Sequence, residues 1–330
     1  MKKYDVFGIG NALVDCVCMV DDSFLVENNI EKGIMTLVDK EKQKLLIEKI
    51  KNTKTFIQSG GSVSNSIFVL SQLGGSGYSS FLVSDDNFGN IYINDLKNNG
   101  VKIGEKKYII ADGMTGSCLV LTTPDAERTM NTCLSISTKY SIKNISFDDL
   151  NNSKYLYIEG YLVASELSMQ AIHDCISYCK KNDIKIALTF SDLSMVKFFK
   201  DKLESILKYK IDLLFCNEEE AKAFSEKPSL NESSDFLLQF SKLVVITRGN
   251  KGSLIASSKE KINIDSVKTD AIDTVGAGDA FSGAFLFGIN NGMGLENSGK
   301  LASALSSKVV SKIGPRLELI DIINIKKSLL

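Results

Sequence analysis

Short apolar runs alternate along most of the chain with segments that place apolar residues on one face of a helix. Runs such as Tyr155–Glu159 and Lys242–Thr247 predict strands, and segments such as Glu166–Lys181 and Glu218–Ser225 predict amphipathic helices. The other predicted strands are Tyr4–Ile9, Tyr78–Val83, Lys185–Phe190, Asp212–Cys216, Ser253–Ser257 and Lys261–Ile264, and the other predicted helices are Lys40–Lys51, Val63–Leu73, Asn87–Asn99 and two closing helices. This alternation favours an α/β fold with a mostly parallel sheet that helices cover on both faces.

Two regions interrupt this alternation with strands that no long helix separates. Val14–Val20 and Gly33–Val38 form one pair, and Lys107–Ala111 and Gly116–Leu121 form the other. Four such strands could form a small sheet over the main one, as a lid that excludes water from a site. The sequence has no internal repeat, low-complexity tract or Pro/Gly-rich linker. We therefore expect a single domain over residues 1–330, with a β lid formed from about 14–38 and 107–131.

A glycine-rich turn, Gly276-Ala277-Gly278-Asp279, begins a predicted helix late in the chain. The first turn of a helix has backbone N–H groups without intrahelical partners, and glycine lets an anion come close to them. A carboxylate such as Asp279 would repel a resting phosphate, but it could accept the proton of a hydroxyl that attacks phosphorus. This arrangement indicates phosphoryl transfer from a nucleotide to an alcohol. The alternative is an ordinary glycine-rich turn that caps a buried helix, with Asp279 placed there for dipole reasons.

Composition and charge narrow the possible functions. Of the 330 residues, 44% are hydrophobic and 24% charged, as in ordinary globular proteins, and a formal net charge of −1 offers no electrostatic attraction for nucleic acid or an anionic membrane. No apolar run approaches the length of a membrane span, and the N-terminal segment is typical of a first strand rather than a signal peptide. We expect a cytoplasmic protein whose seven cysteines are buried thiols. With His173 as the only histidine, serine–histidine and cysteine–histidine schemes are disfavoured.

The first strand ends in Gly8-x-Gly10, but Leu13 occupies the place of the third glycine of a dinucleotide fingerprint. A Walker A loop and the protein-kinase signature motifs are also absent from the sequence. Asn11 and Asp15 instead flank the end of this strand, and ligands of α/β proteins bind beyond the carboxyl ends of parallel strands. Both are candidates for hydrogen bonding to a ligand; alternatively, they are a capping Asn and a surface Asp.

A second pair of glycines, Gly60-Gly61, comes before Ser62 and the helix that carries Asn65. Glycines at a helix start allow a ligand to touch the backbone. Gly61, Ser62 and Asn65 are therefore candidate ligand-binding residues, and a simple N-cap role for Ser62 is the alternative.

Three later features could serve a nucleotide and its metal. Asn217 and Glu220 open the helix after a strand and could hold Mg²⁺ through its water shell, although acidic residues also favour first turns through the helix dipole. The segment Thr247-Arg248-Gly249-Asn250-Lys251-Gly252 follows the next strand; its glycines and cations suit phosphates, although a plain reverse turn would look alike. Arg128, on or beside the predicted lid, could close over the charge that develops in phosphoryl transfer, or be a surface turn residue.

With these motifs the chain resembles the PfkB (ribokinase-like) family of carbohydrate and nucleoside kinases over essentially its whole length. The most specific match is Asp273-Thr274-Val275-Gly276-Ala277-Gly278-Asp279, and Gly60-Gly61 with Asn65, Asn217-x-x-Glu220 and Thr247-Arg248-Gly249 add to it. The opening GIGNALVD and the stretch ASALSSKVVSKIGPR resemble the adenosine-kinase-like bacterial branch. The resemblance implies a three-layer α/β core with a small β lid, ATP as phosphoryl donor and Mg²⁺ as cofactor.

The resemblance also implies roles for individual residues. Asp279 would be the base and the backbone of Gly276–Gly278 the anion hole, with Arg128 near the transferred phosphoryl group. The other implied residues are Asn11, Asp15, Gly61, Ser62 and Asn65 at the sugar or ribose hydroxyls, Leu13, Leu37 and Tyr161 around a purine, Asn217 and Glu220 at the magnesium water shell, and Thr247, Arg248, Gly249 and Gly252 near the nucleotide phosphates. Many relatives also bind a monovalent cation, usually K⁺, and the matching positions are Asp273, Val275 and Gly314.

The implied activity is that of an ATP-dependent kinase for the primary 5′ hydroxyl of a ribonucleoside, adenosine first. A free sugar such as ribose or fructose is the alternative acceptor, and a non-catalytic nucleotide- or sugar-binding protein of the same fold is the third hypothesis. The expected partners are small molecules, with no nucleic acid or membrane, and we expect a monomer or a homodimer.

Overall fold

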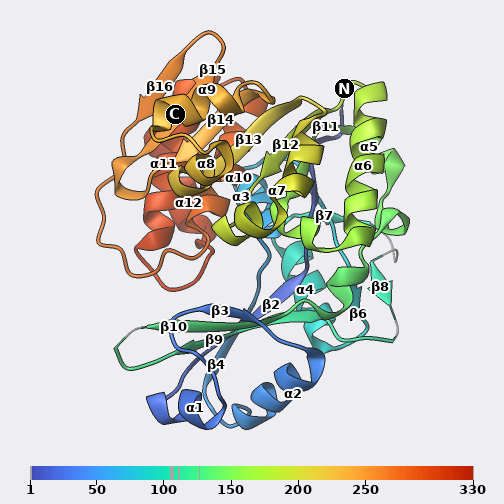
Figure 1. Cartoon of the computed structure of the whole chain (residues 1–330), viewed down its shortest axis with the longest axis vertical. Helices are drawn as coiled ribbons and strands as arrows, with labels where there is room; N and C mark the ends of the chain where they lie inside the picture. The colour runs from blue at the N-terminus through green and yellow to red at the C-terminus, as the bar shows by residue number, and fades with distance from the viewer. Residues whose placement is uncertain (1, 105–107, 111, 126, 330) are drawn as a thin grey trace.

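The computed structural model describes residues 2–104, 108–110, 112–125 and 127–329, and a long, mostly parallel sheet lies at its centre (Figure 1). Within these ranges, nine strands form the sheet in the order β16 (Lys261–Ile264), β15 (Ser253–Ser257), β14 (Ser241–Thr247), β13 (Ile211–Asn217), β12 (Lys185–Thr189), β11 (Ser153–Glu159), β1 (Tyr4–Ile9), β5 (Gly77–Ser80) and β7 (Lys102–Ile103). The strands from β14 to β7 pair in parallel, and β15 and β16 extend the β14 edge as an antiparallel hairpin.

Both faces of this sheet are buried. In β11 the side chains of Tyr155 and Tyr157 enter one apolar core, and those of Leu156 and Ile158 enter the other. This two-sided burial explains why parallel strands appear in the sequence as continuous apolar runs. The first core is completed by α3 (Ser62–Gln72), α4 (Asn87–Asn98), α10 (Ala277–Asn290), α11 (Gly294–Val310) and α12 (Leu319–Leu329), and the second by α5 (Phe147–Asn151), α6 (Glu166–Lys181), α7 (Leu193–Leu207), α8 (Glu218–Ser225) and α9 (Leu230–Leu237). The predicted three-layer α/β fold is confirmed, although α5, α7, α9 and α12 were not predicted.

The cysteines agree with the prediction of buried thiols. All seven cysteines are free and buried, as their apolar surroundings in the sequence predicted. No helix in the described ranges is both long and apolar enough to cross a lipid bilayer.

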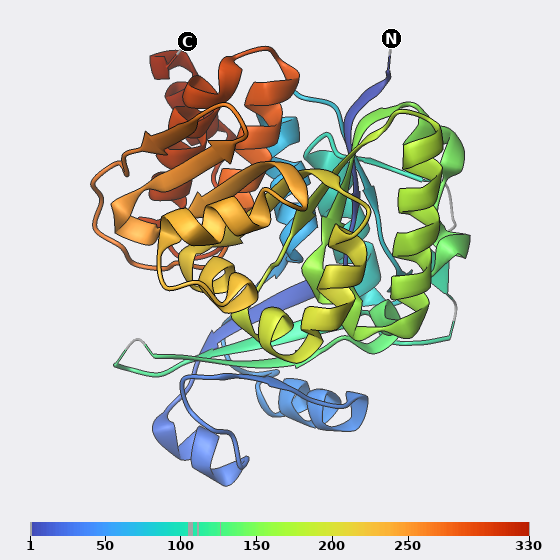
Figure 2. The ribbon, with the colours of Figure 1, turned by 45° about the horizontal axis from the view of Figure 1, so that its top comes forward.

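A second sheet covers one end of the main one and forms the lid (Figure 2). In the described part of the chain it has five strands, in the order β3 (Met35–Leu37), β10 (Arg128–Cys133), β9 (Gly116–Thr122), β2 (Leu13–Met19) and β4 (Thr55–Ser59). Two short helices, α1 (Asp22–Glu27) and α2 (Lys40–Lys49), lie on the side of this sheet that faces away from the main body (Figures 1 and 2).

One of the predicted lid strands does not belong to the lid. Of the stretch 107–111, residues 107 and 111 lie outside the described residues, and Ile109–Ile110 (β8) pairs with Val83–Ser84 (β6) in a separate two-stranded sheet. The lid takes β4 and β10 instead. These two strands pair with β2 and β9, which are longer than β8 and offer more backbone hydrogen bonds.

Helices α3 and α10 approach each other very closely at Gly283. A Cβ atom built on Gly283 would lie 2.2 Å from the backbone oxygen of Ser66 in α3, so no side chain fits there. Because both helices are buried along this contact, their relative position is fixed. The first turns of the two helices thereby come to lie side by side.

This contact predicts that Gly283→Ala destabilises the protein. The new methyl group must push the two helices apart, which we expect to lower the free energy of unfolding by about 1–3 kcal/mol. Gly278→Ala is the matched control in the same helix, because no atom lies within 4 Å of the added Cβ and alanine favours a helix by about 1 kcal/mol over glycine. Chemical denaturation of both variants checks this. Equal stabilities for the two variants would contradict the close packing.

Candidate active site

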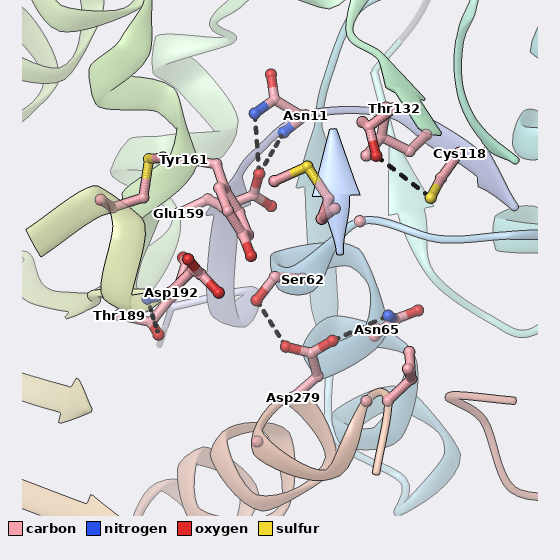
Figure 3. A pocket seen from close by; sticks show the side chains of 18 of the residues that line it. Asn11, Ser62, Asn65, Cys118, Thr132, Glu159, Tyr161, Thr189, Asp192 and Asp279 are labelled. Carbon is pink, nitrogen blue, oxygen red and sulfur yellow. Dashed lines mark hydrogen bonds between the residues drawn. The ribbon is translucent and has the colours of Figure 1, made fainter. Parts of the chain in front are cut away.

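A cavity of about 510 Å³ lies between the lid and the carboxyl ends of the central strands (Figure 3). The predicted residues that line it are Asn11, Leu13, Asp15, Leu37, Gly61, Ser62, Asn65, Tyr161, Asn217, Glu220, Thr247, Val275, Gly276, Gly278 and Asp279. The predicted residues that are not part of its lining are Ala277, Arg128, Arg248, Gly249, Gly252, Asp273 and Gly314. Segments from both ends of the chain thus meet in one place, where an α/β fold is expected to bind its ligand.

Asp279 lies in the first turn of α10 and points toward the start of α3 (Figure 3). The hydroxyl of Ser62 donates to Oδ1 at 2.6 Å, and the Asn65 amide donates from Nδ2 to Oδ2 at 2.9 Å. Burial raises the pKa of this carboxyl, and the two hydrogen bonds work in the opposite direction. The carboxylate is therefore held in one orientation beside the cavity, which is what a general base requires.

The backbone around Asp279 suits an anion. Gly276 is the N-cap of α10 and has φ of +78°, a conformation that favours glycine. A Cβ on Gly276 would also lie 2.4 Å from the Cβ of Pro315. The amide of Ala277 already donates to the Thr274 carbonyl at 3.3 Å, whereas Gly278 opens to the cavity. The positive end of the α10 dipole thus lies against the cavity wall.

Gly61, and not Ser62, caps α3. Gly61 has φ of +90°, and a Cβ there would lie 2.4 Å from the Asn11 backbone oxygen. Ser62 is the first residue of the helix and uses its hydroxyl for Asp279. The simple N-cap interpretation of Ser62 is therefore wrong.

Glu159, at the end of β11, is a buried part of the site that the sequence analysis missed. Its Oε1 accepts from the backbone and side-chain nitrogens of Asn11, both at 3.1 Å (Figure 3). Its Oε2 accepts from the amide of Val63, also at 3.1 Å. Burial raises its pKa to about 7. Glu159 fixes the end of β1 to the start of α3; the only signal in the sequence was a carboxylate at the end of an apolar strand.

The lid side of the cavity combines one carboxylate with an apolar wall. Asp15 on β2 packs against Gly60, where a Cβ would lie 2.5 Å from its Oδ2, and burial raises its pKa to about 7. The apolar wall consists of Leu13, Met35, Leu37, Met130 and Leu134, with Tyr161, Ala164 and Met195 facing them from the main body. A flat apolar group could lie between these two sets of side chains.

Asn217 and Glu220 form a capping box at the start of α8. The Asn217 side chain donates from Nδ2 to Oε1 of Glu220 at 2.7 Å, and the Glu220 amide donates to Oδ1 of Asn217 at 2.8 Å. Both residues therefore cap the helix, which the sequence analysis did not predict, and both side chains also line the cavity. Burial raises the pKa of Glu220 to about 7.

The comparison with known proteins decides the family. The sequence pattern of the pfkB family of carbohydrate kinases matches residues 33–321. The chain belongs to the pfkB family. It is therefore a phosphotransferase that uses an alcohol group as acceptor.

Its relatives include kinases of nucleosides and of sugars. An adenosine kinase from Sinorhizobium meliloti, whose structure is known, shares 31% sequence identity with this chain. The two structures align with a TM-score of 0.89 over 99% of each chain. A "probable sugar kinase protein" from Rhizobium etli CFN 42 is 28% identical, with a TM-score of 0.90 over 100% of both chains. The curated adenosine kinase of Saccharomyces cerevisiae is 27% identical over 93% of this chain and 95% of its own length.

In this pfkB kinase, Arg128 connects the lid to the loop before α10. Its guanidinium forms an ion pair with Asp273, whose carboxylate also accepts from the amides of Val275 at 3.0 Å and Gly314 at 2.7 Å. Asp273 is 4% exposed, so the arginine neutralises a buried charge. Arg128 thus lies beside the glycine-rich turn that begins α10, although it is not part of the cavity lining.

The turn after β14 lies at the rim of the site. Thr247 lines the cavity, and Arg248 pairs through Nε with Glu218 Oε2 at 3.5 Å. Gly249 and Gly252 have φ of +56° and +82°, and a Cβ on Gly252 would lie 1.9 Å from the Ile264 backbone oxygen. The glycines are therefore required by the turn itself, which was the alternative given for this segment.

The buried carboxyls of the site predict how stability changes with pH. Asp15, Glu159 and Glu220 have folded-state pKa values of about 7, against ordinary values of 3.8 for Asp and 4.5 for Glu. Between these values the folded state binds more protons than the unfolded state, so the free energy of unfolding should fall as pH rises from about 4 to about 7. Urea denaturation of the ligand-free kinase at pH 5 and pH 8 measures this. Asp15→Asn, which cannot titrate, should reduce the difference; higher stability at pH 8 than at pH 5 in the wild type would contradict it.

Proposed function

We propose that this kinase transfers the γ-phosphoryl group of ATP to the primary 5′ hydroxyl of a ribonucleoside, with adenosine as the first candidate. The observation that carries the proposal is the carboxylate of Asp279, held by Ser62 and Asn65 at the edge of the cavity and next to the helix start that suits an anion. The similarity to adenosine kinases over nearly the full length supports the choice of acceptor.

In the mechanism, the acceptor hydroxyl takes the place of the Ser62 hydroxyl at Oδ1 of Asp279. Asp279 removes the proton as the hydroxyl oxygen attacks the γ-phosphorus; the bond from this phosphorus to the β–γ bridging oxygen breaks, and ADP leaves. The backbone amides at the start of α10 stabilise the charge on the transferred group, Gly278 among them. The lid excludes water, which would otherwise compete as acceptor.

The polar and apolar walls of the cavity suit the two halves of a nucleoside. Asn11, Asp15 and Asn65 supply hydrogen-bonding groups for ribose hydroxyls. A purine ring in this cavity would contact Leu37 on the lid and Tyr161 on the main body, both of which line it. Apolar contact with the base would give affinity that a free sugar cannot obtain.

The residues present fit Mg²⁺. This ion keeps several of its waters and is bound by one or two carboxylates together with substrate phosphates. Glu220 and Asn217 supply such a donor set on the wall of the cavity. Among the described residues, each Glu220 oxygen accepts one hydrogen bond, and Asn217 is the donor to both. When bound, Mg²⁺ neutralises charge on the ATP phosphates.

The residues matched to K⁺ fit less well. Arg128 already neutralises Asp273, and the amides of Val275 and Gly314 point toward the same carboxylate. Because Arg128 already balances the charge of Asp273, this carboxylate does not favour a bound cation, and the proposed mechanism does not use K⁺.

A sugar kinase is the second candidate function. The buried carboxyls of Asp15 and Glu159 favour it, because they add polar groups to the cavity wall that a free sugar could use. The similarity to the Rhizobium etli protein points the same way. The apolar wall is what favours the nucleoside.

Replacement of the base tests the reaction. Asp279→Asn keeps the size of the side chain but cannot accept the proton, so we expect kcat to fall by about 10²–10⁴ with the KM for ATP nearly unchanged. Asp270→Asn, an exposed carboxylate in the preceding loop, is the matched control and should retain full activity. Steady-state rates of ADP release measure both. Undiminished kcat in Asp279→Asn would refute the base.

A panel of acceptors tests the substrate. With ATP and Mg²⁺ present, we expect kcat/KM for adenosine to exceed that for ribose or fructose by at least about tenfold, because the apolar wall contributes only with a base present. Other ribonucleosides complete the panel. A sugar that is phosphorylated while adenosine is inactive would reverse the order of the two candidates, and no turnover with any acceptor would favour a non-catalytic binding protein.

A further inference from the structure

Arg316, in the segment between α11 and α12, lies buried behind the cavity and contacts three separate elements. Its Nε donates to Oδ1 of Asn65 in α3 at 2.9 Å, and its Nη1 donates to the hydroxyl of Ser59 on β4 at 2.9 Å and pairs with Asp95 in α4. The guanidinium also lies over the ring of Phe68, 4.6 Å from its centre. The side chain is only 8% exposed and is not part of the cavity lining.

The contact with Asn65 fixes which way its amide group faces. A guanidinium can only donate hydrogen bonds, so it pairs with the amide oxygen and not with the nitrogen. The amide nitrogen is then left to face Asp279, and its Nδ2 donates to Oδ2 at 2.9 Å. If the amide turned over, its oxygen would lie against the carboxylate, and two acceptors would repel each other.

Arg316 also brings a positive charge close to a group of acidic side chains. The carboxyls that interact with Asp279 are Asp15 on β2 and Glu159 on β11, and the phenols are Tyr157 on β11 and Tyr161 beyond its end. The charge of Arg316 lowers the pKa of Asp279 against the stronger effect of burial, which raises it. Arg316 acts on the pKa of Asp15 in the same direction.

We propose that Arg316 is a positioning residue of this kinase, which acts through Asn65 to hold the Asp279 carboxylate in the orientation that accepts a proton. The proposal rests on the proposed role of Asp279 as the base. Arg316 then has two separable effects on Asp279. Through the Asn65 amide it fixes the orientation of the carboxylate, and through its positive charge it favours the ionised form. A purely structural role, as the partner of Asp95 that joins α4 to the rest of the protein, would produce neither.

Three variants separate these effects. Arg316→Gln removes the charge and the donor at Nε, Arg316→Lys keeps the charge but loses the planar set of donors, and Asp95→Asn removes the ion pair while it leaves the contact with Asn65. For each variant we would measure kcat and the KM for ATP across pH, together with thermal unfolding to establish that the protein is folded.

We expect kcat to fall by about 10–100-fold in Arg316→Gln, and its acid limb to move to higher pH because the base loses a nearby positive charge. In Arg316→Lys kcat should fall while the acid limb stays in place. Asp95→Asn should retain kcat within about threefold, and the KM for ATP should stay within about twofold in all three. Wild-type kcat and pH profile in both Arg316 variants, or an equal loss in Asp95→Asn, would overturn the proposal.

A second readout does not require activity. The titration of Asp279 in the ligand-free protein can be followed by carbon NMR of labelled aspartate, with Asp279→Asn to assign the signal. The proposal predicts a higher pKa for Asp279 in Arg316→Gln than in the wild type, and an unchanged titration would overturn it. If the wild-type protein phosphorylates no acceptor, the proposed function fails, while this measurement still decides whether Arg316 controls Asp279.

Discussion

The close approach of α3 and α10 is the constraint on which the site depends. A single hydrogen atom on Gly283 leaves room for the backbone of Ser66, and this contact sets the first turns of the two helices side by side. From there Ser62 and Asn65 reach the two oxygens of Asp279, a residue more than two hundred positions away in the sequence. Packing in the core, and not flexible loops, thus places the carboxylate next to the helix start that would hold the phosphoryl group.

The site gathers acidic side chains in a place that water scarcely reaches, and the few arginines of the chain lie beside them. Burial raises the pKa of Asp15, Glu159, Glu220 and Asp279. The three arginines in the sequence each pair with a carboxylate around this region: Arg128 with Asp273, Arg248 with Glu218, and Arg316 with Asp95. Arginine suits such positions because its planar group makes several hydrogen bonds at once and keeps its charge when buried.

Much of the fold could be predicted from the sequence because two-sided burial leaves continuous apolar runs. The strands from β11 to β16 and the helices α6 and α8 appear close to their predicted bounds. The lid was harder to predict because β10 carries buried polar residues on both of its faces. Asn131 accepts a hydrogen bond through its backbone oxygen from Gln43 of α2, and Thr132 lines the cavity. The amphipathic pattern of α7, with Met195, Val196, Leu203 and Ile206 buried, was present in the sequence and could have been used.

The glycine motif of the site was predictable, but the partners of its residues were not. Gly276 and Asp279 belong to one short stretch with a clear pattern. Glu159 and Arg316 act through contacts between distant segments, and no local pattern shows such contacts. Gly10 is a further example. In the sequence it resembles part of an incomplete dinucleotide motif, but in the structure it leaves space for Glu159, whose Oε2 would lie 2.5 Å from a Cβ on Gly10.

A crystal structure of the kinase with a nucleoside acceptor and a non-hydrolysable ATP analogue tests the role of Asp279 most directly. With Asp279 as the base, the acceptor hydroxyl should lie within about 3 Å of Asp279 Oδ1, in line with the γ-phosphorus, and Asn65 should still donate to Oδ2. A hydroxyl bound away from Asp279, with Ser62 and Asn65 still occupying both carboxylate oxygens, would contradict it.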